Sequence, residues 1–310
     1  MFEENVILNR YSNYKIGGRA RYFYIARSIE DLERAIGEAR RIKAPIFILG
    51  GGTNLLISDE GFAGLVLKQN VQTLEAEGEQ VRVGAGVLMS ELLNFAAERG
   101  LAGLEWAGGL PGTVGGAIRG NAGAFGGETK DIVAEITSLD VSGSQPKLIR
   151  RANPEARFGY RTSIYKQEDG KEIIVEATFN LKKGDAGIIR AGMDDKIRYR
   201  LERHPLDYPN IGSTFKNVDL KLAPEKVRLE VAHAVKKDPF PLIPTAYLLS
   251  EAGLKGVSYG GAMFSPKHPN FIVNVMEARA TDVKKLIDLA KATVSEKFEI
   301  ELEEEIIYVK

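Results

Sequence analysis

The stretch that decides the fold is Leu49-Gly50-Gly51-Gly52-Thr53-Asn54-Leu55-Leu56. A second glycine-rich stretch, from Gly108 to Gly127, follows after a block of mixed helix and strand. Glycine lets the backbone take positive φ and lets a ligand approach without a side chain in between. Successive free N–H groups in such turns form a concave donor nest that suits a pyrophosphate. Because both stretches are dense and both include Thr and Asn, we predict two halves of one dinucleotide cradle.

The composition narrows the class of protein. At 310 residues the chain is long enough for two or three domains. Its 42 Lys and Arg balance its 42 Asp and Glu, so a general role on nucleic acids or membrane surfaces has no electrostatic support. The absence of cysteine excludes disulfides, thiolate catalysis and Cys-ligated metal sites. No apolar run approaches the ~20 residues of a membrane helix, and Met1-Phe2-Glu3-Glu4 is no signal peptide. We therefore expect a cytoplasmic protein.

The first glycine stretch follows a small α/β pattern. Ser28-Ile29-Glu30-Asp31 has the form of a capping box, and apolar residues then recur at helical spacing up to Ala39. The apolar run 45–49 predicts a strand that leads directly into the glycines, and open sheets bind ligands at such strand ends. No long helical pattern starts after these glycines, so this is not the Rossmann fingerprint.

Two further regions follow. From about Gly64 to Arg198 the pattern is rich in strands, with one helix over 90–99 and a long alternating run, 173–181, that predicts a half-buried strand. From about Tyr199 the chain carries many prolines and ends with a helical stripe from Val283 to Phe298, flanked by strands.

Three short segments contain residues suited to catalysis. Arg161 lies between aromatic residues in the segment 157–164, and Ser213 follows a glycine and precedes a Lys and an Asn in the segment 212–217. Glu305 directly precedes an apolar strand, whereas an acidic run is usually a solvated face. The three histidines have no metal-ligand spacing, so we expect no metal site.

Taken in order, these segments resemble the UDP-N-acetylenolpyruvoylglucosamine reductase family, and the resemblance spans nearly the whole chain. Its shorter type fits best, because no large insertion interrupts the strand-rich region. The matching pieces are the two glycine stretches, 14–18, 157–164, 205–217, 251–256, 260–262, 267–274 and 300–307.

The resemblance implies an α+β fold. Two α/β lobes would form an FAD-binding unit of the vanillyl-alcohol-oxidase (PCMH) kind, with a third α+β domain for the substrate. The expected divisions are 1–64 for the first lobe, 65–198 for the second, 199–300 for the substrate domain and 301–310 for a C-terminal strand that carries Glu305.

The resemblance also implies a two-stage reaction. NADPH would reduce FAD and leave, and UDP-N-acetylglucosamine enolpyruvate would then take a hydride from flavin N5 and become UDP-N-acetylmuramate, a peptidoglycan precursor. The catalytic residues would be Arg161, Ser213 and Glu305. Arg161 would bind the substrate carboxylate, and Ser213 would donate a proton to carbon. Glu305 would be protonated or share a proton in the complex, because a second carboxylate would otherwise repel the substrate's.

The resemblance assigns further residues to binding. The implied FAD-binding residues are Leu49, Gly50, Gly51, Gly52, Thr53, Asn54, Leu55, Gly112, Thr113, Val114, Gly116, Asn121, Gly123 and Ala124. The implied substrate-binding residues are Tyr160, His204, Tyr208, Lys216 and Asn217. The implied partners are the two small-molecule substrates, with no nucleic acid, membrane or obligate protein partner.

Two other functions fit parts of this pattern. One is a different FAD-dependent oxidoreductase on the same scaffold, acting on a small alcohol or hydroxy acid. The glycine stretches fit it equally well, but such an oxidase needs no proton donor to carbon. The other is a nucleotide-binding module without catalysis, which has no need of Arg161, Ser213 and Glu305.

Overall fold

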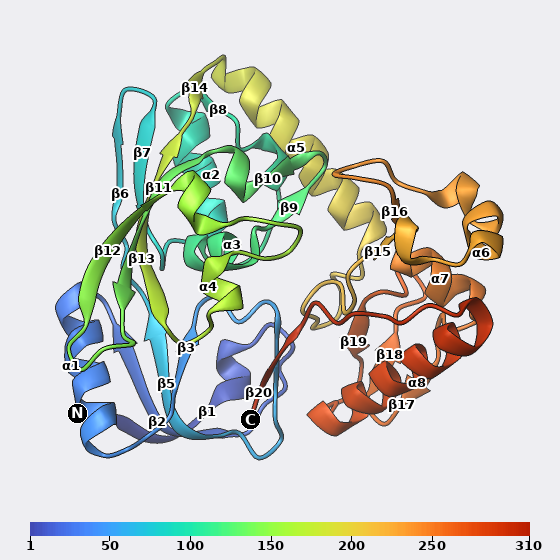
Figure 1. Ribbon diagram of the computed structural model, residues 1–310, viewed down its shortest axis with the longest axis horizontal. Helices are drawn as coiled ribbons and strands as arrows, with labels where there is room; N and C mark the ends of the chain where they lie inside the picture. The colour runs from blue at the N-terminus through green and yellow to red at the C-terminus, as the bar shows by residue number, and fades with distance from the viewer. The chain divides into compact units, whose positions relative to one another are not determined.

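The computed structural model describes residues 1–310, and the chain divides into two compact units (Figure 1). Unit 1 contains Met1–Val6, Ala20–Gly51 and Ala63–Arg200, and unit 2 contains Ile7–Arg19, Gly52–Phe62 and Leu201–Lys310. The segments 7–19 and 52–62, expected in the first lobe, thus group with unit 2. The chain passes from one unit to the other inside the first glycine loop, between Gly51 and Gly52.

Unit 1 is built on two sheets. A four-stranded sheet has the order β1-β2-β5-β3, with β1 (Glu3–Ile7), β2 (Arg19–Ala26), β3 (Ile46–Leu49) and β5 (Phe62–Gln69). A five-stranded sheet has the order β12-β11-β13-β7-β6 and is antiparallel throughout. Its strands are β6 (Leu74–Glu77), β7 (Gln80–Gly84), β11 (Val133–Asp140), β12 (Lys147–Ala152) and β13 (Glu172–Asn180). Two short pairs join β8 (Leu101–Ala102) to β14 (Lys182–Lys183) and β9 (Gly123–Ala124) to β10 (Gly127–Glu128).

The helices of unit 1 cover these sheets. They are α1 (Ile29–Arg41), α2 (Met89–Glu98), α3 (Val114–Gly120), α4 (Ile164–Gln167) and α5 (Ala186–Arg203), which runs just past the unit boundary. α1 lies beside β2 and β5 (Figure 1) and buries the predicted apolar face from Leu32 to Ala39. The predicted capping residue is confirmed, because the Ser28 hydroxyl accepts a hydrogen bond from Asp31 N at 3.2 Å.

Unit 2 combines small sheets with one long helix. β4 (Leu55–Ile57) pairs in parallel with β20 (Ile307–Val309), and β15 (Val218–Asp219) pairs with β16 (Leu242–Ile243). A three-stranded antiparallel sheet contains β17 (Ser258–Tyr259), β18 (Ala262–Phe264) and β19 (Ile272–Asn274). The helices are α6 (Glu225–Glu230), α7 (Thr245–Glu251) and α8 (Ala280–Phe298). The predicted stripe from Val283 to Phe298 is buried along α8, so that prediction is confirmed.

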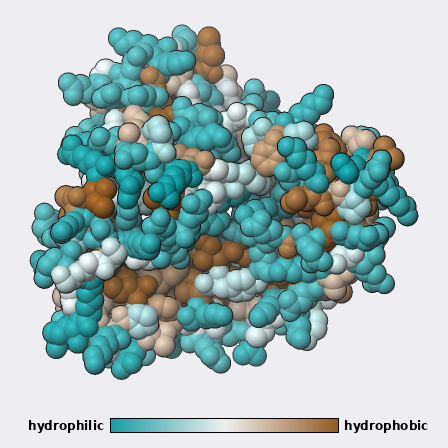
Figure 2. All heavy atoms as spheres, in the orientation of Figure 1, coloured by the Kyte–Doolittle hydropathy of each residue, from teal (hydrophilic) through white to brown (hydrophobic).

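The parallel pairing of β3 with β5 and of β4 with β20, together with the antiparallel sheets, confirms the α+β class. No helix of the chain is both long and apolar enough to cross a membrane. The face in Figure 2 is mostly hydrophilic, with a hydrophobic area where Figure 1 places α6 and β16. The exposed Leu222 and Leu229 belong to this part of unit 2.

The strand at 173–181 differs from its prediction in one respect. The register of β13 against β11 shifts between Ile174 and Glu176, and such a bulge reverses the alternation of side chains. Ile173 and Val175 therefore enter the core around α1, whereas Ala177 and Phe179 enter the core around α2 and α3. The strand therefore contributes to two cores, and it is buried on both faces only over Ile173–Val175.

The N-cap of α1 gives a first testable prediction. Ser28→Ala removes the acceptor for Asp31 N, and we expect a loss of about 1 kcal/mol in the free energy of unfolding, measured by urea denaturation. Ser28→Asp, which keeps an acceptor, should retain most of the stability. Equal stability of Ser28→Ala and the parent protein would contradict the assigned cap.

Candidate functional site

The two glycine loops touch each other in unit 1. A Cβ on Gly50 would lie 2.8 Å from Thr113 Oγ1, and one on Gly51 would lie 2.7 Å from the Cα of Gly112. Real Cβ atoms do not come so close to a backbone atom, so only glycine at position 51 permits this approach to Gly112. Gly112 also has φ of +106°, which disfavours other residues. The two predicted halves of the cradle are thus in contact at Gly50, Gly51, Gly112 and Thr113.

Two polar groups of the cradle have no partner within the protein. No protein acceptor is present for the N–H group of Gly51, and the hydroxyl of Thr113 is buried without a hydrogen bond. Buried polar groups without partners are rare in folded proteins. Together these groups fit a phosphate-bearing ligand, which accepts hydrogen bonds from N–H and O–H donors.

The first N–H groups of α3 are not available to a ligand, because they bind backbone carbonyls of the protein. The N–H groups of Val114 and Gly115 donate to the carbonyls of Val87 and Ala85, both at 2.9 Å. These two donors hold the second loop against the chain that follows β7. Gly116 lies beside Thr113, and Leu49 is the buried last residue of β3.

Lys68 binds the first glycine loop, although the sequence analysis assigned it no role. Its Nζ donates to the carbonyl of Gly50 at 3.1 Å. Burial lowers the pKa of Lys68. In the sequence, the only feature that could have indicated this role is the position of the lysine directly after the apolar run 65–67. Its charge polarises the Gly50–Gly51 peptide and so strengthens the N–H of Gly51 as a donor.

The end of the second loop is tied to the turn that carries Arg161. The buried Asn121 uses both amide atoms on backbone, with Nδ2 donating to Gly159 O and Oδ1 accepting from Lys130 N, each at 3.0 Å. The Arg161 guanidinium donates to Gly123 O at 2.9 Å. The side chain of Asn121 thus has a structural role, and hydrogen bonds connect the loop to the turn that contains Arg161.

Arg161 adopts an unusual backbone conformation. Gly159 and Thr162 exchange backbone hydrogen bonds of 3.0 and 3.2 Å, which closes a tight turn over Tyr160 and Arg161. Arg161 has φ of +56° there, a region that L-residues rarely occupy and that clusters at functional sites. Its guanidinium lies 5.2 Å from the ring centroid of Tyr160.

A second arginine shares the environment of Arg161. Arg200 Nε donates to Gly108 O at 2.9 Å, while its buried Nη2 has no hydrogen-bond partner. Burial and, to a lesser degree, the charge of Arg161 lower the pKa of Arg200. The second loop thus contacts two guanidinium groups, Arg200 at its start and Arg161 near its end, and such groups suit a carboxylate or phosphate.

In unit 2 the structure brings Glu305 against the segment that contains Ser213. Glu305 N donates to Thr214 O at 2.8 Å, and Lys216 N donates to Glu303 O at 2.9 Å. On its other side Glu305 O accepts from Nδ2 of Asn54 at 3.0 Å. The catalytic candidates Ser213 and Glu305 therefore lie on adjacent backbone segments, directly beside the end of the first glycine loop and the start of β4 at Leu55.

The predicted substrate-binding residues of unit 2 have varied contacts. Lys216 forms an ion pair with Glu303, and Asn217 Oδ1 accepts from Thr245 N at the start of α7 at 3.1 Å. The ring of His204 lies 4.9 Å from that of Phe271, and Tyr208 is exposed. Tyr160, the fifth of these residues, belongs to unit 1.

His268 packs beside His204 and was not assigned a role from the sequence. The two rings lie 5.5 Å apart, and His268 Nδ1 is buried without a partner. Burial, together with the charge of Lys236, lowers the pKa of His268 to about 4. The imidazole is therefore neutral at neutral pH.

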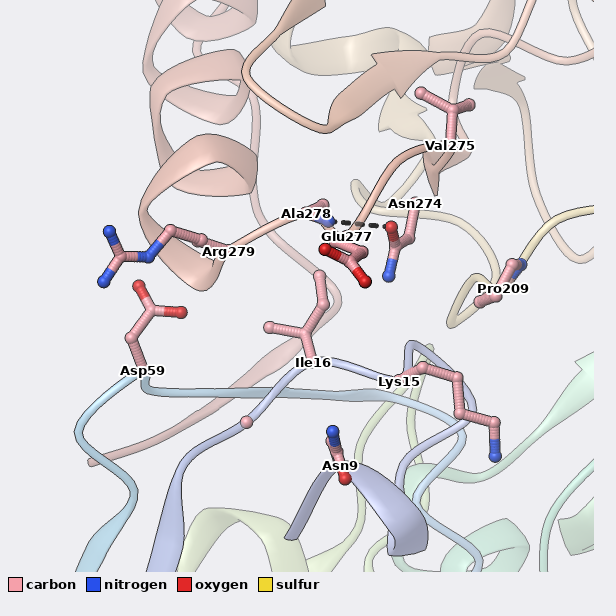
Figure 3. A pocket seen from close by; sticks show the side chains of 11 residues that line it. Asn9, Lys15, Ile16, Asp59, Pro209, Asn274, Val275, Glu277, Ala278 and Arg279 are labelled. Carbon is pink, nitrogen blue, oxygen red and sulfur yellow. Dashed lines mark hydrogen bonds between the residues drawn. The ribbon is translucent and has the colours of Figure 1, made fainter. Parts of the chain in front are cut away.

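A groove of about 610 Å³ in unit 2 contains none of the catalytic candidates (Figure 3). Its charged residues are Lys15, Asp59, Glu277 and Arg279. Asp59 caps α8 through hydrogen bonds from Ala280 N at 2.7 Å and Thr281 N at 3.1 Å. The two positive and two negative charges of the groove balance. The carboxylate of Asp59 is already used to cap α8.

Two protein families match the chain. The family described as the C-terminal domain of UDP-N-acetylenolpyruvoylglucosamine reductase matches residues 204–309, which include Ser213 and Glu305. The family described as an FAD binding domain matches residues 20–148, which include both glycine loops. The predicted FAD-binding unit is thereby confirmed.

Several proteins that match nearly the whole chain are reductases of that name. The UDP-N-acetylenolpyruvoylglucosamine reductase of Clostridium novyi is 36% identical over 98% of this chain and 91% of its own. That of Thermotoga maritima is 40% identical over 99% of this chain and 97% of its own. The crystal structure of the Thermus caldophilus reductase superposes with a TM-score of 0.78 at 31% identity, and all of both chains is covered.

The contact between the glycine loops gives a prediction for FAD binding. Gly51→Ala would place a methyl group against Gly112 and push the loops apart, so we expect the purified protein to lose its FAD, measured as flavin absorbance per protein. The control is Gly37→Ala in α1, where a Cβ meets no atom within 4 Å. It should keep its FAD and gain about 0.5–1 kcal/mol of stability. Full FAD content in Gly51→Ala would contradict the cradle.

The environment of His268 predicts how stability depends on pH. Because its pKa falls from 6.5 to about 4 on folding, the unfolded chain binds more protons between these values, and stability is lost as pH falls from 6.5 to 4. The loss through this group is at most about 3 kcal/mol. His268→Gln should flatten the pH dependence in urea denaturation at pH 7 and pH 5. An unchanged slope would show that His268 is not buried in its neutral form.

Proposed function

Because the chain belongs to the UDP-N-acetylenolpyruvoylglucosamine reductase family, we propose that it reduces UDP-N-acetylglucosamine enolpyruvate to UDP-N-acetylmuramate, with NADPH as the source of the hydride. This product is a precursor of peptidoglycan, and the proposed location is the cytoplasm, where NADPH is available.

One observation carries this proposal beyond family membership. The backbone pairing of Glu305 with Thr214 places the carboxylate segment against the serine segment, and Asn54 joins both to the end of the first glycine loop. A simple alcohol oxidase needs no proton donor to carbon, so it has no use for this arrangement. A reductase of a carbon–carbon double bond requires one.

The chemistry that bound FAD would supply is a hydride for the terminal alkene carbon of the substrate. The residues that would hold FAD are those of the two glycine loops, in particular Gly51 and Thr113, whose unpaired donors fit its pyrophosphate. The neighbouring substrate carbon, next to the carboxylate, then becomes basic and must be protonated.

The protein's own residues would manage that charge. Arg161 offers a planar, permanently charged fork to the substrate carboxylate and stabilises the negative charge that develops there. The Ser213 hydroxyl would donate its proton to the basic carbon and recover one from solvent. Glu305 would hydrogen-bond the carboxylate through a shared proton, and Lys216 and Asn217 would lie toward the UDP pyrophosphate.

An anaerobic titration of the purified protein tests the proposed function. NADPH should bleach the oxidised-flavin absorbance band, and UDP-N-acetylglucosamine enolpyruvate added without oxygen should restore it. Bleaching without recovery would favour an FAD-dependent oxidase of a small alcohol. A protein with no flavin band after addition of FAD would contradict the proposal altogether.

Variants of the catalytic candidates give a further prediction. Ser213→Ala should still be bleached by NADPH, but recovery with substrate should slow by about 10²–10⁴-fold because the proton donor is gone. Glu305→Gln should also slow recovery. Glu301→Gln, an exposed carboxylate that bonds Ser295, is the control and should behave as the parent protein. Full recovery rates in Ser213→Ala and Glu305→Gln would remove these residues from the reaction.

A further inference from the structure

The segment after Ser213 is held on both edges, although it belongs to no extended sheet. On one edge Thr214 O accepts from Glu305 N and Lys216 N donates to Glu303 O. The other edge has no strand beside it. Unpaired backbone groups at a buried edge are costly, so another partner must satisfy them.

Asn270 is that partner. Its backbone O accepts from Thr214 N at 2.7 Å, its side-chain Oδ1 accepts from Phe215 N at 3.0 Å, and its Nδ2 donates to Phe215 O at 2.9 Å. Asn270 is only 2% exposed, so these bonds form away from solvent. One residue therefore takes the place of a neighbouring strand.

The result is a run of peptide planes with little freedom. The plane between Ser213 and Thr214 is held by Asn270 O. The next two planes are each held by an Asn270 side-chain atom on one edge and by the 303–305 segment on the other. Gly212, with φ of +82°, precedes the run as a turn. The position of Ser213 thus follows from the anchored peptide immediately after it.

The loop around Asn270 is itself well ordered by hydrogen bonds. It joins β18 to β19, and the buried Ser265 hydroxyl accepts from Lys267 N at 3.1 Å and His268 N at 3.3 Å. Phe271 N donates back to His268 O at 2.9 Å. These bonds hold the backbone of the loop that contains Asn270. The three hydrogen bonds of Asn270 with Thr214 and Phe215 therefore start from a fixed backbone position.

We infer that Asn270 is a positioning residue that sets the place of the Ser213 hydroxyl for proton transfer, an inference that rests on the proposed function. Asn270 acts through Ser213 and does not itself react. A displacement of about 1 Å at a reacting group is sufficient to slow a reaction by about 10²-fold. Loss of the Asn270 hydrogen bonds should therefore slow the substrate step and spare flavin reduction, because NADPH oxidation uses no proton from Ser213.

The test compares the two half-reactions of Asn270→Ala by stopped-flow absorbance, at saturating NADPH and then at saturating substrate. We expect flavin reduction within about twofold of the parent protein and reoxidation slower by about 10²-fold. In a Ser213→Ala background, Asn270→Ala should add less than about threefold, because residues that act as a unit are not additive. Equal slowing of both half-reactions, or full additivity, would overturn the inference.

Asn274→Ala, at the end of β19, is a matched control (Figure 3). Asn274 also bonds backbone with both amide atoms, to Tyr14 O at 3.0 Å and from Ala278 N at 2.8 Å, but it does not touch the Ser213 segment. This variant should lower stability and leave the ratio of the reoxidation rate to the flavin-reduction rate unchanged. A lower ratio in Asn274→Ala as well would mean that general loosening of unit 2 is responsible.

A second variant covers the case in which Asn270→Ala fails to bind FAD. Asn270→Asp keeps the size and the acceptor for Phe215 N but loses the donor to Phe215 O, so it should show the same selective slowing. Selective slowing in neither variant would overturn the inference. A parent protein that substrate cannot reoxidise would instead refute the proposed function, and the inference with it.

Discussion

The arrangement of unit 2 depends on two hydrogen bonds to the backbone of Glu305. Its N–H binds Thr214 O, and its carbonyl binds Nδ2 of Asn54, a residue 251 positions away. The parallel pairing of β20 with β4 continues this contact. Because of these bonds, the end of the first glycine loop, the Ser213 segment and the C-terminal strand form one hydrogen-bonded layer. A shift in any one of them must move the other two.

In unit 1 the two glycine loops are constrained by their close packing against each other, whereas the segments of unit 2 are constrained by backbone hydrogen bonds. Gly50 and Gly51 leave no room for side chains against Gly112 and Thr113, and Lys68 holds the loop from behind. Arg161 is fixed in a left-handed conformation that costs about 1–2 kcal/mol for an L-residue. The turn and its bond to Gly123 O maintain that conformation, which is consistent with strain retained at a functional site.

Local patterns were sufficient to predict the elements whose ends and faces are local properties. Ser28 and the spacing from Leu32 to Ala39 predicted α1, and the stripe from Val283 predicted α8. The bulge in β13 escaped prediction because it exists only in register with β11. A single strand sequence contains no record of its partner's register.

The candidate site was predicted in part. The contact of the glycine loops and the meeting of Ser213 and Glu305 segments agree with the expected groupings. The roles of single asparagines did not emerge, because an amide that binds a ligand and one that binds backbone look alike in a sequence. Asn121 and Asn270 use their amides on backbone, and Asn217 uses its amide oxygen in the same way. Only the folded chain distinguishes them.

We propose that Arg161, Ser213 and Glu305 act on one substrate beside FAD. A crystal structure of the FAD-loaded protein with UDP-N-acetylglucosamine enolpyruvate bound tests it most directly. We expect the Arg161 guanidinium, the Ser213 hydroxyl and the Glu305 carboxyl all to contact the enolpyruvyl group of the same substrate molecule. FAD should be held between the two glycine loops. A substrate bound away from Ser213 and Glu305, or FAD bound outside the loops, would contradict it.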